Sequence, residues 1–132
     1  MIEKVLIMFG SIASIGFGVW HLFVPTFWHW YSYIDSRATE LIVAIRAINV
    51  FFSLSLILFG VMNLLFIHAD RANRYALSVL LGATSFLWLV RVIFQLVYPQ
   101  GTINPILQFG MLGAFCAVFL CYFVAFWRMM AK

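Results

Sequence analysis

Four long apolar segments, separated by short breaks that are polar or contain proline, constrain this sequence more than any other feature. Each segment is near or above the ~20 residues that an α-helix needs to cross the roughly 30 Å hydrocarbon core of a bilayer. With 66% hydrophobic residues, a chain of 132 residues has more apolar surface than a water-soluble domain of this size can bury. We therefore expect a single all-α transmembrane domain over residues 1–132. It would be an antiparallel bundle of four transmembrane helices, at residues 5–24, 40–67, 75–98 and 105–127.

The basic residues predict how the helices are oriented. In a four-span arrangement Arg37 falls in a loop on one side, and the opposite side carries Lys4, Arg71, Arg74, Arg128 and Lys132. Cytoplasmic flanks of membrane helices are enriched in Lys and Arg. We expect an N-in and C-in topology, with both termini cytoplasmic, in a bacterial cytoplasmic membrane. The net charge of +4 does not indicate a nucleic-acid partner, because no basic cluster with interleaved aromatic residues is present.

The stretch GVWHLFVPTFWHWYSYIDSR, residues 18–37, combines histidines with many aromatic residues. Its tryptophans and tyrosines from Trp28 onward lie where a span ends, which is typical of the aromatic belt at a membrane interface. His29 falls among them and is expected to belong to this belt. His21 differs, because it continues a stripe of small residues, Gly10, Ser14 and Gly18, that would let a neighbouring helix approach closely.

Polar side chains inside the other spans recur at similar depths. Arg46 and Asn49 share a face of the second span, Arg91 and Gln95 share a face of the third, and Gln108 begins the fourth. Polar groups inside a membrane span call for a partner or a function. We expect His21, Gln95 and Gln108 to form one ring, with the arginines and Asn49 one turn deeper. The half of the bundle nearer the termini is expected to be mainly apolar, apart from Asn63 and Ser78.

The two arginines carry the functional hypothesis. None of the four acidic residues falls inside a span opposite Arg46 and Arg91, and paired guanidinium groups favour a carboxylate or phosphate between them. The pattern predicts a cationic pocket in the outer half of the bundle that binds or transports an anionic or quinone-like amphiphile. The predicted ligand-binding residues are His21, Glu40, Arg46, Asn49, Arg91, Gln95 and Gln108. Three alternatives stay open: the arginines could reach the head groups of membrane lipid, bond carbonyl groups at helix ends, or stack on Trp28, Trp30 or Trp88.

Other functions have weaker support. No pair of histidines on different spans shares a depth, as a haem held by two histidines would need, and we predict no metal site. No catalytic residue is evident, which favours a binding protein over an enzyme acting alone. A membrane oxidoreductase, or a subunit binding quinone, haem or metal through His21, stays open, as does a structural subunit of a larger complex. A stripe of small residues in the fourth span predicts a homo-oligomer through Gly113, Ala117 and Cys121, or else packing within one bundle.

Overall fold

The computed structural model describes residues 1–69 and 73–131, and this part of the chain is helical with short connections. The helices are α1 (Ile2–Phe27), η1 (Trp30–Tyr33), α2 (Thr39–His68), α3 (Arg74–Val97) and α4 (Pro105–Met130). The four α-helices are each long and apolar enough to cross a membrane. They confirm the four predicted helices, and α1 extends three residues beyond the predicted end at residue 24. Arg71 and Lys132, which entered the prediction of orientation, lie outside the described residues.

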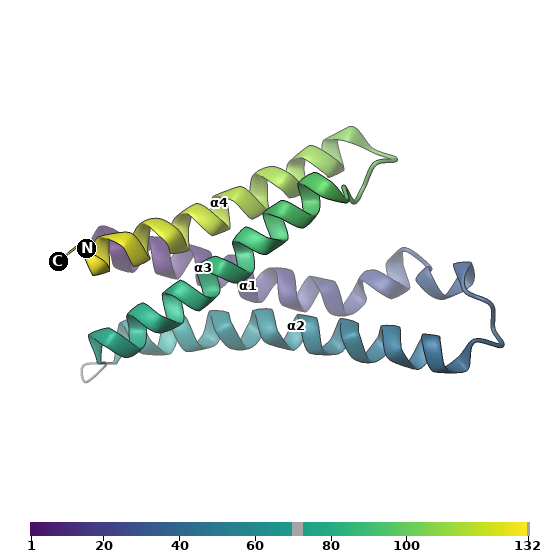
Figure 1. The fold of residues 1–132 in the computed structure, drawn as a ribbon, viewed down its shortest axis with the longest axis horizontal. Coiled ribbons are helices and arrows are strands. Elements are labelled where there is room, and N and C mark those ends of the chain that lie inside the picture. Colours follow the sequence, from purple (N-terminus) through teal and green to yellow (C-terminus); the bar gives the residue numbers. More distant parts are fainter. Residues whose placement is uncertain (70–72, 132) are drawn as a thin grey trace.

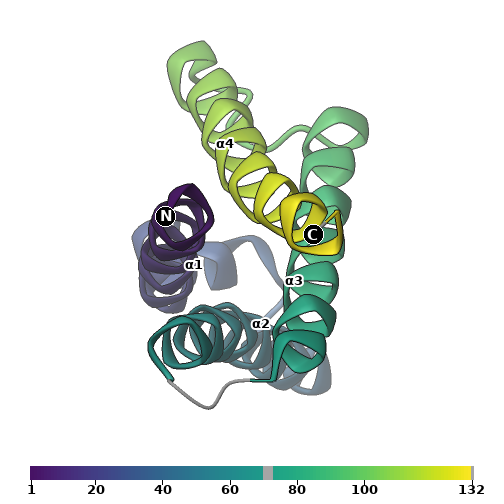
Figure 2. The ribbon, with the colours of Figure 1, turned by 90° about the vertical axis from the view of Figure 1, so that its left-hand side faces the viewer.

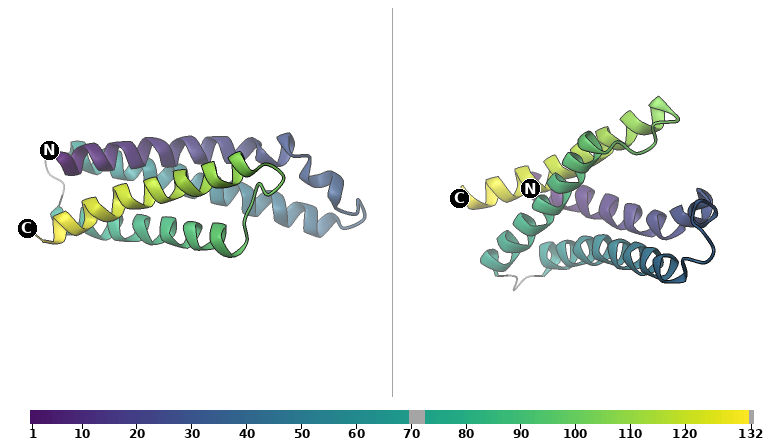
Figure 3. Two further views of the ribbon diagram at one scale, coloured as in Figure 1. Left: turned by 90° about the horizontal axis from the view of Figure 1, so that it is seen from above. Right: turned by 45° about the vertical axis from the view of Figure 1, so that its right-hand side comes forward.

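The helices form two antiparallel hairpins, α1 with α2 and α3 with α4 (Figure 1). Both chain termini lie at one end of the bundle, called the terminal end here. η1 and the α3–α4 connection lie at the other, called the loop end. The hairpins pack together toward the terminal end and diverge toward the loop end, as the right-hand view of Figure 3 shows. Between the hairpins, α1 packs mainly on α4, whereas α2 and α3 have few contacts (Figure 2).

Glycines allow the backbones of α1 and α2 to pack closely. A Cβ atom on Gly18 would lie 2.7 Å from the Ser53 carbonyl oxygen, and one on Gly60 would lie 2.8 Å from that of Ser11. Only a residue without a Cβ lets two helix backbones approach this closely. The prediction that Gly18 faces a closely packed neighbour is confirmed.

A chain of buried hydrogen bonds joins α1 to both helices of the other hairpin. Trp88 Nε1 donates to Ser14 Oγ over 3.0 Å. Ser14 Oγ in turn lies 3.2 Å from the Tyr122 hydroxyl, which donates to Ser11 Oγ over 3.2 Å. Because hydrocarbon offers no partner for a polar group, such contacts determine which helix faces can meet.

The region nearer the termini is more polar than the sequence predicts. Asn63 is fully buried in α2 and donates to Thr84 Oγ1 of α3 over 3.0 Å. Ser78 is buried as well. Ser11 and Ser14 of α1 and Thr84 of α3 are further buried polar residues that the sequence did not single out for this region. A serine or threonine in a helix can bond the carbonyl four residues earlier, as Thr84 does with Leu80, so a small polar residue is tolerated in the core.

The small-residue stripe of α4 is largely open. Gly113 and Ala117 are exposed and Cys121 is half-buried, and a Cβ on Gly113 would meet no atom of the described chain within 4 Å. Ala125, one turn further, is buried in the bundle. Oligomerisation through Gly113, Ala117 and Cys121 stays a prediction.

Asn104 caps α4 as its position before Pro105 predicts, since its Oδ1 accepts a hydrogen bond from the Ile106 N–H over 3.0 Å. We expect Asn104→Ala to lower the free energy of unfolding by about 1 kcal/mol, the usual cost of losing such a cap. Thr102→Ala, which changes an exposed hydroxyl in the same connection, is the control. Unfolding by SDS in mixed micelles measures both. Equal stability of the two variants would contradict a capping role.

Candidate functional site between the two hairpins

His21 and Asn49 form a reciprocal pair between α1 and α2. His21 Nδ1 lies 2.7 Å from Asn49 Oδ1, and Asn49 Nδ2 donates to the His21 carbonyl oxygen over 3.1 Å. That carbonyl needs a partner because residue 25, which would normally donate to it within the helix, is a proline without an N–H. Asn49 therefore supplies the hydrogen bond that Pro25 removes, and it fixes the position of the histidine ring.

Arg91 and Gln95 lie across from this pair on α3. The Arg91 guanidinium carbon is 4.2 Å from the centre of the Phe115 ring, and Arg91 Nη2 donates to Gln100 Oε1 over 2.7 Å. Gln95 is only 2% exposed, and its Nε2 donates to the Gln100 carbonyl over 3.0 Å. Its Oε1 is buried and has no hydrogen-bond partner among the described residues.

Three aromatic rings connect the two sets of polar groups. Phe17 of α1 lies 5.6 Å from Trp88 of α3 and 5.3 Å from Phe115 of α4, measured between ring centroids. His21 is one helical turn beyond Phe17, and Arg91 is about one turn beyond Trp88, both toward the loop end. The Phe115 ring that packs against Phe17 of α1 also lies under the Arg91 guanidinium, so Arg91 lies beside the contact between α1 and α4. We call His21, Asn49, Arg91 and Gln95 the inter-hairpin site.

The described residues provide no carboxylate for Arg91. Over residues 1–69 and 73–131, both ion pairs involve Glu3 at the terminal end. Arg91 is half-buried, so its charge is only partly screened by solvent. A half-buried guanidinium whose neighbours are an aromatic ring and an amide oxygen retains donors for an anionic or carbonyl-bearing group.

The other predicted site residues make contacts that differ from those of Arg91. Arg46 is exposed, with its guanidinium carbon 4.9 Å from the centre of the Tyr31 ring. Glu40 is exposed in the first turn of α2. Gln108 is half-buried near the start of α4, where the hairpins have diverged (Figure 1). The two arginines thus stack on different aromatic rings, neither of them one of the predicted tryptophans, and the ring of His21, Gln95 and Gln108 stays a prediction.

The sequence did not reveal the part that Gln100 plays. Gln100 bonds both Arg91 and Gln95, although it lies in the connection between α3 and α4. Gly101 has a φ of +79°, a backbone conformation that glycine adopts without strain, and it turns the chain directly after Gln100. The Gln-Gly pair after Pro99 was the available signal for a turn, but the direction of the glutamine depends on the folded connection.

The aromatic stretch after α1 folds into η1 and lies at the loop end. Trp28 and Tyr33 are exposed, as an interfacial belt requires. His29 is also exposed and is separated from His21 by the last turns of α1. In the described part of the chain, no group of three or more His, Cys, Asp or Glu residues could hold a metal ion. Both cysteines there are free thiols.

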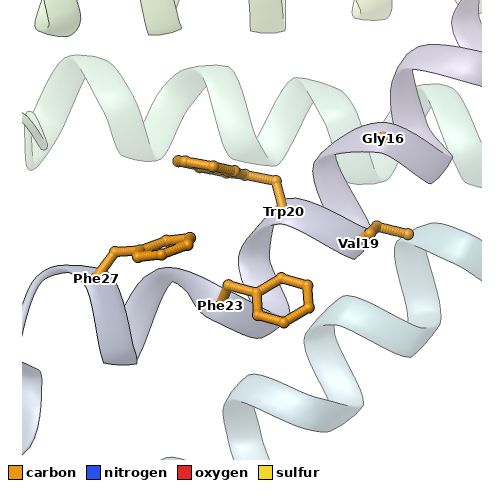
Figure 4. Close-up of a pocket in the computed structure, with 5 residues that line it drawn as sticks. All are labelled: Gly16, Val19, Trp20, Phe23 and Phe27. Carbon is orange, nitrogen blue, oxygen red and sulfur yellow. The ribbon is translucent and has the colours of Figure 1, made fainter.

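An apolar groove of about 540 Å³ follows the same turns of α1 as His21. It is lined by Gly16, Val19, Trp20, Phe23 and Phe27, and Figure 4 shows the three aromatic rings projecting from one side of the helix. The groove is open and has almost no polar lining. Its chemistry suits a hydrocarbon chain, whereas the inter-hairpin site suits a polar head group.

Comparison with known protein families, characterised proteins and solved structures returns no match for this chain. The fold and the inter-hairpin site define a class, an integral membrane four-helix bundle with a half-buried cation between its hairpins. The chemistry of that site is the basis for a functional proposal.

Proposed function

We propose that this protein binds or transports a membrane amphiphile whose head group presents acceptor oxygens, such as a carboxylate, a phosphate or a quinone carbonyl. The observation that supports this most directly is Arg91, half-buried between the hairpins and without a carboxylate partner in the described chain. Arginine is well suited to this role because its planar guanidinium can donate two parallel hydrogen bonds. With both termini cytoplasmic, the site opens toward the outer leaflet.

His21 and Gln95 complete the recognition of the head group. Because Asn49 Nδ2 donates to the His21 carbonyl, Asn49 Oδ1 is the acceptor and His21 Nδ1 carries the proton. The neutral ring then has its Nε2 lone pair available for a hydroxyl or an acid proton. Gln95 Oε1, buried without a partner in the described chain, can accept a second hydrogen bond. A head group that combines acceptor oxygens for Arg91 with a hydroxyl proton for His21 or Gln95, as a monoprotonated phosphate does, fits this arrangement best.

The apolar outer turns of α1 supply a surface for the tail. The outer turns of α1 present Trp20, Phe23 and Phe27 to an open groove, not to a packed helix (Figure 4). A ligand could therefore enter sideways from the bilayer, with its chain along α1 and its head beside His21. This places the charge near the interface and the tail in hydrocarbon, as the energetics of a membrane require.

Binding of a dibrominated stearate and of the matching dibrominated alcohol tests this proposal. Bromine quenches nearby tryptophan fluorescence. Trp20 lines the groove, and Trp88 lies about one helical turn from Arg91. We expect the carboxylate to bind the wild-type protein at least tenfold more tightly than the alcohol, because hydrogen bonds to charged groups contribute about 1.5–3 kcal/mol. Arg91→Gln is expected to remove this preference.

Arg46→Gln is the matched control, since it removes the same charge from an exposed position on α2. If Arg46→Gln and Arg91→Gln weaken carboxylate binding equally, the anion contacts both arginines, as the sequence predicts, and Arg91 is not the main contact. If the wild-type protein does not distinguish the acid from the alcohol, the proposal of an anion site is wrong. A benzoquinone with a decyl tail tests the carbonyl ligand, and its binding should be weakened less than tenfold by Arg91→Gln.

A further inference from the structure

A second cavity, of about 570 Å³, opens at the terminal end of the bundle, opposite to the inter-hairpin site. Residues of all four helices line it. Its walls include buried apolar side chains from three helices, namely Ile7, Ile67 and Leu77. Lys4 and Arg74 also line it, so the cavity combines an apolar interior with basic side chains. Its volume lies within the roughly 300–1,000 Å³ that is common for small-molecule sites.

The basic side chains at this cavity are not neutralised by its acidic residue. Glu3 also lines the cavity, but its carboxylate pairs with Arg128, Nε to Oε1, over 3.2 Å. Lys4 is exposed and has no hydrogen bond or ion pair to any other described residue. Arg74 donates from Nη2 to the Met129 carbonyl, which holds its guanidinium at the end of α4 and leaves its other N–H groups available.

Helix dipoles do not account for the positive character of this end. α1 and α3 begin here, while α2 and α4 end here, so two positive helix ends lie beside two negative ones. The positive groups that line the cavity are Lys4, Arg74 and the N-terminal ammonium of Met1, which pairs with Glu3. An arginine that donates in a planar fork, together with a mobile lysine ammonium, is a combination suited to phosphate oxygens.

We propose that this cavity binds the phosphate of an anionic phospholipid head group. A transmembrane bundle has its helix ends at the level of the lipid phosphates, so the cavity opens where these groups lie. Lys4 and Arg74 contact the phosphate, and the apolar wall of Ile7, Ile67 and Leu77 covers the glycerol and the first carbons of the chains. A zwitterionic lipid binds less well, since its ammonium group is repelled by the same two cations. The site is separate from the inter-hairpin site and involves none of its residues.

Native mass spectrometry of the full chain tests this proposal, using mixed micelles that contain phosphatidylglycerol and phosphatidylcholine in equal amounts. We expect the wild-type protein to retain phosphatidylglycerol preferentially. Lys4→Gln and Arg74→Gln should each weaken this retention about fivefold, the effect of one cation near a lipid phosphate. Arg37→Gln is the control, because it removes one exposed positive charge at the loop end. Lys4→Gln removes no hydrogen bond within the described chain, so its effect does not depend on altered folding.

Equal retention of the two lipids by the wild-type protein would overturn the proposal. So would equal effects of Lys4→Gln, Arg74→Gln and Arg37→Gln. Competition with inorganic phosphate shows whether the cavity recognises phosphate alone or an intact phospholipid. If millimolar phosphate displaces the lipid, the cavity recognises phosphate itself. If phosphate does not displace it, the lipid chains contribute and the ligand is the intact phospholipid. Both of these results support a phosphate site at Lys4 and Arg74.

Discussion

Gly18→Ala is expected to destabilise the protein by about 1–3 kcal/mol, the usual cost of overpacking a closely packed interior. The new Cβ would lie 2.7 Å from both the Ser53 carbonyl oxygen and Ile57 Cγ1. The carbonyl belongs to the backbone of α2, so the clash cannot be relieved by a side-chain rotation, and the two helices must separate. His21 and Asn49 lie one turn further along the same interface. Separation of the helices should therefore also disturb the inter-hairpin site.

The same substitution two residues earlier provides the control. A Cβ on Gly16 meets no atom of the described chain within 4 Å. Gly16→Ala is therefore expected to be neutral or to stabilise α1 by up to about 1 kcal/mol, since alanine favours a helix more than glycine does. Gly18→Ala should therefore lower Tm, whereas Gly16→Ala should leave it unchanged or raise it. Cys116 and Cys121 are half-buried free thiols, so their reaction with a maleimide dye on heating reports unfolding. Equal Tm values for the two variants would contradict the close approach of α1 and α2.

Trp88→Ala is expected to have the largest effect on stability, a loss of about 3–5 kcal/mol, as for other large aromatic residues in protein cores. Trp88 is 2% exposed and packs against Phe17 and Phe115, so its removal leaves a cavity where the two hairpins meet. Its Nε1 also donates to Ser14, and that hydrogen bond is lost. Because Phe115 supports the guanidinium of Arg91, binding at the inter-hairpin site should weaken as well.

Trp20→Ala is the matched control for the loss of an indole, because Trp20 is 49% exposed on the groove face of α1. It should cost much less stability, although it removes part of the proposed surface for the ligand tail. Trp88→Phe separates the two contributions of Trp88, since it keeps an aromatic ring and removes only the N–H. We expect it to cost about 0.6–1.7 kcal/mol for the hydrogen bond, plus a smaller packing loss. If Trp88→Ala and Trp20→Ala have equal Tm values, Trp88 does not connect the hairpins.

The helices and much of their local chemistry could be predicted from the sequence. Apolar segments of sufficient length specify helices in a bilayer, because a helix is one of the few structures that satisfies its own backbone hydrogen bonds there. The cap at Asn104 and the close approach at Gly18 follow from residue types at particular positions. The spacing of small residues in α1 distinguishes His21 from the residues of the aromatic belt. In the structure the His21 ring forms a hydrogen bond with Asn49.

The grouping of residues within the site could not be predicted in the same way. Helical periodicity gives the face of a residue on its own helix, but not the angle at which two helices cross. The sequence groups Arg46 with Arg91 by depth alone, and only the structure shows that Arg46 lies over Tyr31 and Arg91 over Phe115. Their contact with a common ligand stays a prediction. Gln100 lies outside the predicted spans, and only the folded connection directs it toward Arg91.

The sequence by itself determined that this chain is a bundle of four membrane-spanning helices, because lipid imposes length and apolarity on each segment independently of the others. It also determined that His21 has a carbonyl in need of a partner, since Pro25 lacks the N–H to supply one. Only the tertiary structure decided that Asn49 supplies that partner and that the hairpins diverge toward the loop end. The physical reason is that contacts between helices depend on the fit of whole surfaces, which residues distant in the sequence determine together.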